Sequence, residues 1–104
     1  MNKNYLKELV CEANKINPEN EIMMERNRQK RLEEMSKNII ETMEYLDTCE
    51  ENELLWATEV LEDLAEHFKS KELVVCVERN AKRCVEQETI NQLNMVIEYM
   101  YKYF

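Results

Sequence analysis

The absence of glycine constrains the fold of this 104-residue chain more than any other feature of its sequence. Hairpin turns of sheet proteins need residues with positive φ, and phosphate-binding loops need a close backbone approach that only glycine permits. A sheet-rich fold, a P-loop and a dinucleotide-binding fingerprint are therefore not expected. The length suits a single domain, residues 1–104, whose core holds about twenty side chains.

Apolar residues recur with helical spacing through most of the chain, which predicts an all-α fold of about five helices. Because the connections are short, neighbouring helices should run antiparallel, as in an antiparallel helical bundle or a short HEAT-like α-solenoid. The expected helices cover residues 4–16, 19–47, 52–68, 71–84 and 88–104. The second is the least uniform, and one long helix is favoured over a break near Ser36-Lys37-Asn38.

A basic stretch interrupts the apolar pattern of the expected second helix. Residues 25–31 contain no apolar side chain and carry four basic ones, Arg26, Arg28, Lys30 and Arg31. Three flanking glutamates, Glu25, Glu33 and Glu34, nearly cancel this charge. A solvated helix surface with internal ion pairs is therefore favoured over a phosphate-binding site. Pro18 is expected to open this helix at its first position, with Asn17 as the N-cap.

The negative charge of the chain is concentrated in one segment, the acidic tract between Lys37 and Lys69. The tract contains ten acidic residues and no lysine or arginine, so it carries −10 while the rest of the chain carries +2. Like charges at helical neighbour spacing cost a few tenths of a kcal/mol per pair, and a surface serving solubility alone normally mixes signs. The tract therefore predicts a surface that binds a basic partner.

Two aromatic residues near this surface are expected to anchor the partner, because aromatic side chains dominate interface energetics. The predicted partner-binding residues are Glu41, Glu44, Tyr45, Asp47, Trp56, Glu59, Glu62, Asp63 and Glu66. The alternative is a merely solvated acidic surface on which Trp56 partly covers a neighbouring helix.

The last expected helix has a second apolar side opposite its main stripe. Met95, Tyr99 and Tyr103 lie there at helical spacing. This side is either buried between neighbouring helices or forms the interface of a homodimer. The first alternative is favoured, with the tyrosine hydroxyls left in water.

The composition bears on location and on partners. The net charge of −8 argues against nucleic acid or an anionic membrane as a partner. There is no apolar run of about 18 residues and no signal-peptide pattern, so a cytoplasmic location is expected. The four cysteines lack a C-x-x-C spacing and are expected to be buried or half-buried thiols without a disulfide, redox or metal role.

The sequence offers little support for catalysis or for a metal centre. His67 is the only histidine, and Asp63 one turn before it could orient its ring, but no nucleophile is placed near them. Glu59, Asp63 and His67 share a helical side, yet one histidine cannot supply the paired Glu-x-x-His motifs of a di-iron bundle. We therefore expect no catalytic residue, no metal and no cofactor.

Residues 53–65, ELLWATEVLEDLA, followed by Ser70-Lys71-Glu72-Leu73, resemble small all-α HEAT-like immunity proteins encoded beside bacterial polymorphic or contact-dependent growth-inhibition toxins. The hairpin that holds these residues, 51–84, is about a third of the chain. The resemblance implies a non-catalytic cytoplasmic protein that binds one cognate toxin domain, often a nuclease, and occludes its active site. Such toxins are usually basic, so an acidic inhibitor would replace their phosphate contacts. The alternative is a homo-oligomeric structural or adaptor module that uses its last helix as the interface.

Overall fold

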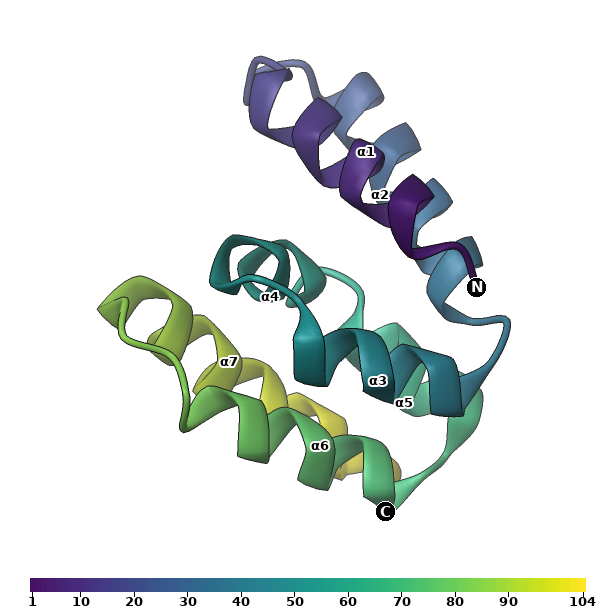
Figure 1. Cartoon of the computed structure of the whole chain (residues 1–104), viewed down its shortest axis with the longest axis vertical. Coiled ribbons are helices and arrows are strands. Elements are labelled where there is room, and N and C mark those ends of the chain that lie inside the picture. The colour runs from purple at the N-terminus through teal and green to yellow at the C-terminus, as the bar shows by residue number, and fades with distance from the viewer.

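The protein is built from helices alone (Figure 1), and the computed structural model describes residues 1–104. In chain order the elements are α1 (Lys3–Lys15), α2 (Glu21–Met35), α3 (Ile39–Thr48), α4 (Glu51–Ala57), α5 (Leu61–Phe68), α6 (Lys71–Ala81), α7 (Gln87–Met100) and the 3-10 helix η1 (Tyr101–Tyr103). The prediction of an all-α fold is confirmed. The predicted number of about five helices is wrong, because the chain forms seven α-helices.

The helices are arranged in two layers (Figure 1). Helices α1, α3 and α6 lie toward the viewer, and α2, α5 and α7 lie behind them. The most extensive packing joins α6 to α7, followed equally by α1 to α2, α3 to α6 and α5 to α7. The α1–α2 hairpin stands at one end of the molecule and contacts α4 and α5 over short stretches.

The single long helix expected over residues 19–47 is wrong. Three residues, 36–38, separate α2 from α3, at the place the sequence had offered as the alternative. The Asn38 side chain accepts a hydrogen bond from the Glu41 amide and caps α3, while the Thr42 hydroxyl donates to the Met35 carbonyl at 2.6 Å. Similarly, α2 begins at Glu21 with Asn20 as its cap, so the predicted start at Pro18 is also wrong.

The helix expected over residues 52–68 is divided at residues 58–60. Val60 is fully buried with φ −121° and ψ −8°, outside helical geometry. This turn gives α5 a direction of its own, independent of α4. At its other end α5 stops at Lys69, whose φ of 49° makes it the one residue in the left-handed region. A chain without glycine thus uses a left-handed residue to end a helix at one place only.

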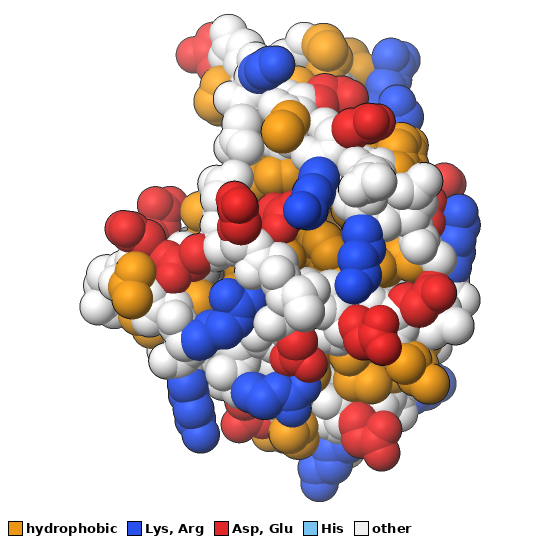
Figure 2. All heavy atoms as spheres, in the orientation of Figure 1, with side chains coloured by type: hydrophobic (Ala, Val, Ile, Leu, Met, Phe, Trp, Pro, Cys, Tyr) orange, Lys and Arg blue, Asp and Glu red, His pale blue; other side chains and the backbone are white.

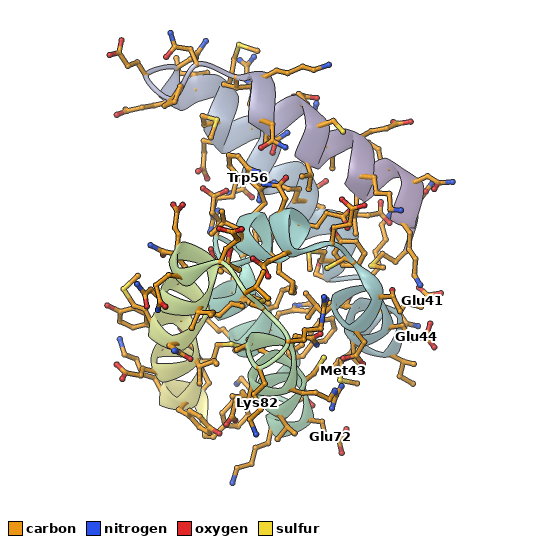
Figure 3. All side chains as sticks on the ribbon, turned by 60° about the vertical axis from the view of Figure 1, so that its left-hand side comes forward. Glu41, Met43, Glu44, Trp56, Glu72 and Lys82 are labelled. Carbon is orange, nitrogen blue, oxygen red and sulfur yellow. The ribbon has the colours of Figure 1, made fainter.

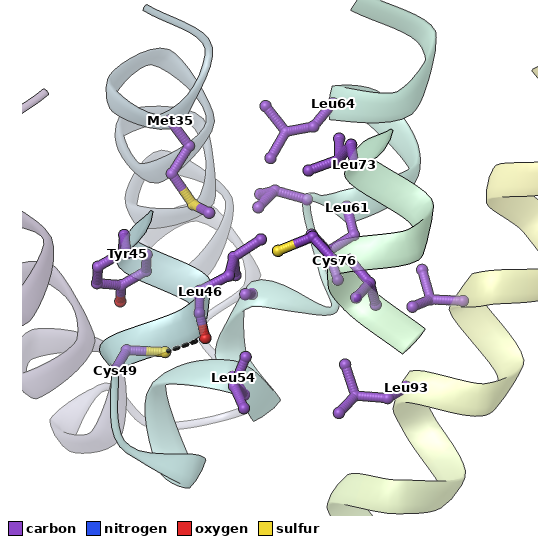
Figure 4. Close-up of a cluster of buried hydrophobic side chains, with 14 of the residues drawn as sticks. Met35, Tyr45, Leu46, Cys49, Leu54, Leu61, Leu64, Leu73, Cys76 and Leu93 are labelled. Carbon is purple, nitrogen blue, oxygen red and sulfur yellow. Dashed lines mark hydrogen bonds between the residues drawn. The ribbon is translucent and has the colours of Figure 1, made fainter. Parts of the chain in front are cut away.

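The core lies between the layers and contains the apolar stripes predicted for the separate helices (Figure 4). Leu61, Leu73 and Leu93, from α5, α6 and α7, are completely buried. Cys49, Cys76 and Cys84 are buried as predicted, whereas Cys11 is exposed, contrary to the prediction. Burial raises the pKa of Cys49 to about 12 and that of Cys76 to about 11, so both thiols stay protonated.

Candidate functional site: the groove between α5 and α7

The acidic tract does not form one continuous surface. Its first part lies on α3, which packs against α6 in the near layer, and its last part lies on α5, which packs against α7 in the far layer. Glu41 and Glu44 project together from the outer side of α3 (Figure 3). The two parts of the tract therefore have different neighbours.

Two of the three α3 carboxylates contact basic groups, whereas the exposed Glu44 has no ion pair. Glu41 accepts a hydrogen bond from the Met1 ammonium nitrogen at 2.6 Å. Asp47 binds Arg79 at 2.8 Å and Asn80 at 2.7 Å, and the Arg79 contact holds the pKa of Asp47 below its ordinary value. The near face of the molecule accordingly mixes acidic and basic side chains (Figure 2). Here the tract ties helices together.

Tyr45 does not lie at the rim of an acidic surface, as the sequence predicted. Only 3% of it is exposed, because it packs into the core beside Leu46 and Cys49 (Figure 4). Burial, reinforced by the nearby Glu53 carboxylate, raises the pKa of its phenol. Tyr45 is therefore a core residue and is not available to anchor a partner.

Two carboxylates, that of Asp63 on α5 and that of Glu59 in the turn just before it, bind arginines of α2. Arg31 is 2% exposed and donates to the Glu59 carboxylate at 2.5 Å, to the Trp56 carbonyl at 2.8 Å and to the Asn27 side chain at 2.7 Å. Arg28 donates to the Asp63 carboxylate and to the Glu59 carbonyl. We call this cluster the α2–α5 junction; its members are Asn27, Arg28, Arg31, Trp56, Glu59 and Asp63.

Trp56 belongs to this junction, where it lies between the α1–α2 hairpin and the rest of the molecule (Figure 3). The Cζ atom of Arg31 is 5.4 Å from its ring centroid, within the range of a cation–π interaction. The indole N–H donates to the Asn14 side chain of α1 at 2.9 Å. Of the two sequence-based interpretations of Trp56, its contacts match the one in which it covers a neighbouring helix.

The junction corrects part of the interpretation of the basic stretch as a solvated surface with internal ion pairs: Arg26 and Lys30 are exposed and Arg28 pairs with Glu25 as predicted, but Arg31 is buried. Arg31 and Asn27 are buried and connect three helices, since the Asn27 side chain also donates to the Leu9 carbonyl of α1 at 2.8 Å. The available signal was the match between two arginines three residues apart on one helix and two acidic residues four apart, one in the turn before α5 and one on α5. That match is visible only once α2 and α5 are known to be neighbours.

The α7-facing side of α5 borders a groove, which we call the α5–α7 groove. A hollow of about 280 Å³ is lined by Glu62 and Asp63 of α5 and by Met95 and Tyr99 of α7. Met95 is 47% and Tyr99 42% exposed, so both of these predicted interface residues offer apolar surface to a partner. The structure thereby joins two sets of residues that the sequence had predicted separately.

Two carboxylates on this side, Glu62 and Glu66, take part in no ion pair or side-chain hydrogen bond of the protein. The half-buried Tyr103 lies close enough to feel their negative charge. Burial, followed by the Glu62, Glu66 and Asp63 carboxylates, raises the pKa of its phenol. The ammonium of Lys102 lies 4.3 Å from the Tyr99 ring centroid. Arg28 also lines the hollow and is paired with Asp63, so the groove combines exposed aromatic surface with one lining carboxylate, Glu62, that has no cation partner.

The side chains discussed above as catalytic or metal-binding candidates contact other groups of the protein. His67 Nε2 is 3.1 Å from the Ser36 carbonyl oxygen, while Asp63 and Glu59 turn toward the arginines of α2. No group of three or more histidine, cysteine, aspartate or glutamate side chains is arranged to hold a metal ion. None of the helices has the length and apolar character needed to span a bilayer.

No protein-family model matches this chain, and no curated protein or solved structure is significantly similar to it. The site is therefore interpreted from its own geometry.

Proposed function

We propose that this chain is a non-catalytic binding protein that captures a basic protein partner in the α5–α7 groove. The supporting observation is that Glu62, which lacks an internal cation, lines the groove beside the exposed Met95 and Tyr99, while the unpaired Glu66 lies near enough to help raise the pKa of Tyr103. Carboxylates around an exposed aromatic side chain fit a partner that offers lysine or arginine together with apolar contact. The electrostatic attraction would speed association, and the aromatic contacts would slow dissociation.

The position of Glu66 supports this proposal. It lies in the C-terminal half of α5, where the helix dipole disfavours negative charge, and Glu62 and Asp63 lie one turn before it. The unfavourable position in the helix dipole and the repulsion from Glu62 and Asp63 each oppose folding by a few tenths of a kcal/mol. A carboxylate that opposes folding and has no internal partner is typical of a side chain used in binding.

We further propose that the partner is a toxin domain, in keeping with the resemblance to HEAT-like immunity proteins, and that this domain is a basic nuclease. Binding would then block the nuclease by covering its substrate groove, with the acidic side chains occupying sites that otherwise hold phosphates. The two helical layers of Figure 1 would represent a short α-solenoid, with α1, α3 and α6 in one layer and α2, α5 and α7 in the other. In this arrangement α5 and α7 form one outer surface of the stack.

The rival function, a homodimer through Met95, Tyr99 and Tyr103, receives less support. In a two-fold dimer the same surface meets itself, so two copies of Glu62 and Glu66 would be brought together, and the unpaired Lys102 beside Tyr99 would offset only part of their repulsion. Sedimentation of the isolated chain separates the alternatives. A stable dimer that dissociates in the Met95→Lys variant would favour the rival.

The test compares two charge-reversed variants against a panel of purified basic nuclease toxin domains. E62K/E66K changes the groove, whereas the control E8K/E12K reverses two exposed carboxylates with the same spacing on α1. We expect the native chain to bind and inhibit at least one domain. E62K/E66K should weaken this binding by about tenfold or more, while the control should weaken it far less.

Failure of every domain to bind would overturn the toxin-inhibitor proposal. Equal weakening by both variants would show that net charge, and not the groove, accounts for binding.

A further inference from the structure

The α6–α7 pair, at the end of the molecule opposite the α1–α2 hairpin (Figure 1), has an apolar hollow on its outer side. The hollow measures about 460 Å³, and its lining includes Ala81, Cys84, Ile90 and Ile97. Ile90 and Ile97 are half-buried, because each packs against the core on one side and borders the hollow on the other. Tyr101, which follows them along the chain, is 41% exposed. The pair therefore presents apolar surface away from the α5–α7 groove.

The residues on this side of α7 have the spacing of a coiled-coil seam. Ile90, Asn94, Ile97 and Tyr101 are separated by four, three and four residues, which is the spacing of the a and d positions of a heptad repeat. We call these four residues the α7 seam. Asn94 is exposed and takes an a-type position, where a polar residue fixes the register of a helix pair. The α7 seam is therefore suited to contact with another helix.

The α7 seam is symmetric about Asn94. Ile90 lies four residues before it and Ile97 three residues after it, while Gln87 and Tyr101 lie seven residues to either side. In an antiparallel pair of α7 helices with a two-fold axis at Asn94, Ile90 would lie opposite Ile97 of the other copy. The two Asn94 amides would meet at the axis, and each offers both donors and an acceptor to the other.

The charges beside the α7 seam match the same symmetry. Asn91 and Glu98 lie three residues before and four residues after Asn94, so each Glu98 would lie opposite an amide. On α6, Glu78 and Lys82 both border the hollow one turn apart, and the axis would bring Glu78 of one copy near Lys82 of the other. Lys82, labelled in Figure 3, is exposed and takes part in no ion pair within the chain. Among these residues no like charges are brought together.

From this symmetry we infer that the outer side of the α6–α7 pair binds a second copy of the chain, with the two α7 helices antiparallel and Asn94 at the two-fold axis. Met95 and Tyr99 lie on the other side of α7, so the dimer leaves both α5–α7 grooves open and does not depend on the proposed function.

The size of this surface predicts a weak dimer. The 14 residues of α7 extend over about 20 Å, and two packed helices are about 20 Å wide. A surface of these dimensions is at the low end of the range for specific interfaces. Association should therefore be reversible and depend on concentration.

Sedimentation equilibrium of the full chain from about 10 µM to about 1 mM measures this association. We expect monomer at low concentration and dimer at high concentration. The matched variants N94K and M95K add the same charge at neighbouring exposed positions on opposite sides of α7. N94K places two ammonium groups at the axis and should weaken the dimer about tenfold or more, whereas M95K should change it far less.

Two further variants test the arrangement of the two copies. N94L should tighten the dimer about tenfold, because it replaces the polar residue at the centre of the seam by an apolar one. K82E places a carboxylate opposite Glu78 and should weaken the dimer about fivefold. The control K71E reverses an exposed lysine in the first turn of α6 and should have a smaller effect.

A chain that stays monomeric over the whole concentration range would overturn this inference. Equal weakening by N94K and M95K would also overturn it, as would dissociation by M95K alone, which would put the interface on the Met95 side of α7. A gain in N94L is not expected from a general loss of folding, so it separates association from stability. Binding of a basic domain in the α5–α7 groove is tested independently by E62K/E66K.

Discussion

The α2-facing and α7-facing sides of α5 carry the same type of residue and use it differently. Toward α2, Asp63 and, in the turn just before α5, Glu59 bind two arginines, one of which is almost completely buried. Toward α7, Glu62 and Glu66 have no cationic partner; Glu62 lines the groove beside the exposed Tyr99, and Glu66 lies near Tyr103. One acidic helix thus connects the α1–α2 hairpin to the rest of the molecule and also offers charge to a partner.

The difference shows that the function of a charged segment depends on its neighbours and not on its composition. If this comparison is correct, substitutions on the α2-facing side should change stability, and those on the α7-facing side should change binding.

The largest effect is expected for R31M. Methionine cannot replace the hydrogen bonds to Asn27, the Trp56 carbonyl and Glu59, so buried polar atoms lose their partners, and the free energy of unfolding should fall by about 2–3 kcal/mol. Urea unfolding measures this loss. The control R26M alters an exposed arginine of the same helix and should change stability by less than about 0.5 kcal/mol. Equal losses would mean that the α2–α5 junction contributes little.

W56F should have the next largest effect. Phenylalanine keeps the ring beside Arg31 but loses the N–H donated to Asn14, so stability should fall by about 1 kcal/mol while partner binding stays unchanged. N14A removes the same hydrogen bond, and the double variant should lose less than the sum of the two single variants. A loss of binding without a loss of stability would restore Trp56 as an anchor.

Much of the fold could be predicted from the sequence, because the apolar stripe of each helix is a pattern of residue spacing within that one segment. Leu6, Leu9, Leu61, Leu64 and Leu73 are buried as their spacing predicted. The helix breaks could not be predicted in the same way. The turn at residues 36–38 is about one helical turn long, so the stripe resumes almost in phase after it, and a continuous helix gives nearly the same pattern.

The site could be predicted only in parts. The acidic side of α5 and the second side of α7 are each visible as helical spacing, but nothing local shows that these two sides meet. The misinterpretation of Arg31 has the same origin, since a stretch of charged residues is normally solvated unless a distant helix supplies carboxylates. Both the groove and the junction arise from tertiary packing.

A smaller effect is expected for D63N. This substitution keeps the size of the side chain and removes the charge that binds Arg28, and because the Asp63 side chain is 40% exposed the loss should be about 0.5 kcal/mol. The matched control, E62Q, removes a charge from the same first turn of α5 without breaking an ion pair. The difference between the two variants should shrink in high salt. A loss in E62Q as large as that in D63N would show that the helix dipole, not Arg28, accounts for both.

The smallest effect on stability, opposite in sign, is expected for E66Q. Removing this charge relieves repulsion from Glu62 and Asp63 and an unfavourable position in the helix dipole, so stability should rise by about 0.3 kcal/mol while binding weakens. The phenol of Tyr103 provides a local readout, because the nearby carboxylates help to raise its pKa above the ordinary value of 10.0.

A raised pKa in the folded state favours the neutral phenol, so this contribution to stability is present below pH 10.0 and is lost as the pH rises through the folded value. In E66Q the pKa of Tyr103, followed by NMR of its ring carbons, should move down toward 10.0. E44Q, at an exposed position on α3 in the other layer, should leave it unchanged. If E66Q were destabilising, or if Tyr103 titrated as in the native chain, Glu66 would not contribute to the field of the groove, and the contrast between the two sides of α5 would rest on Glu62 alone.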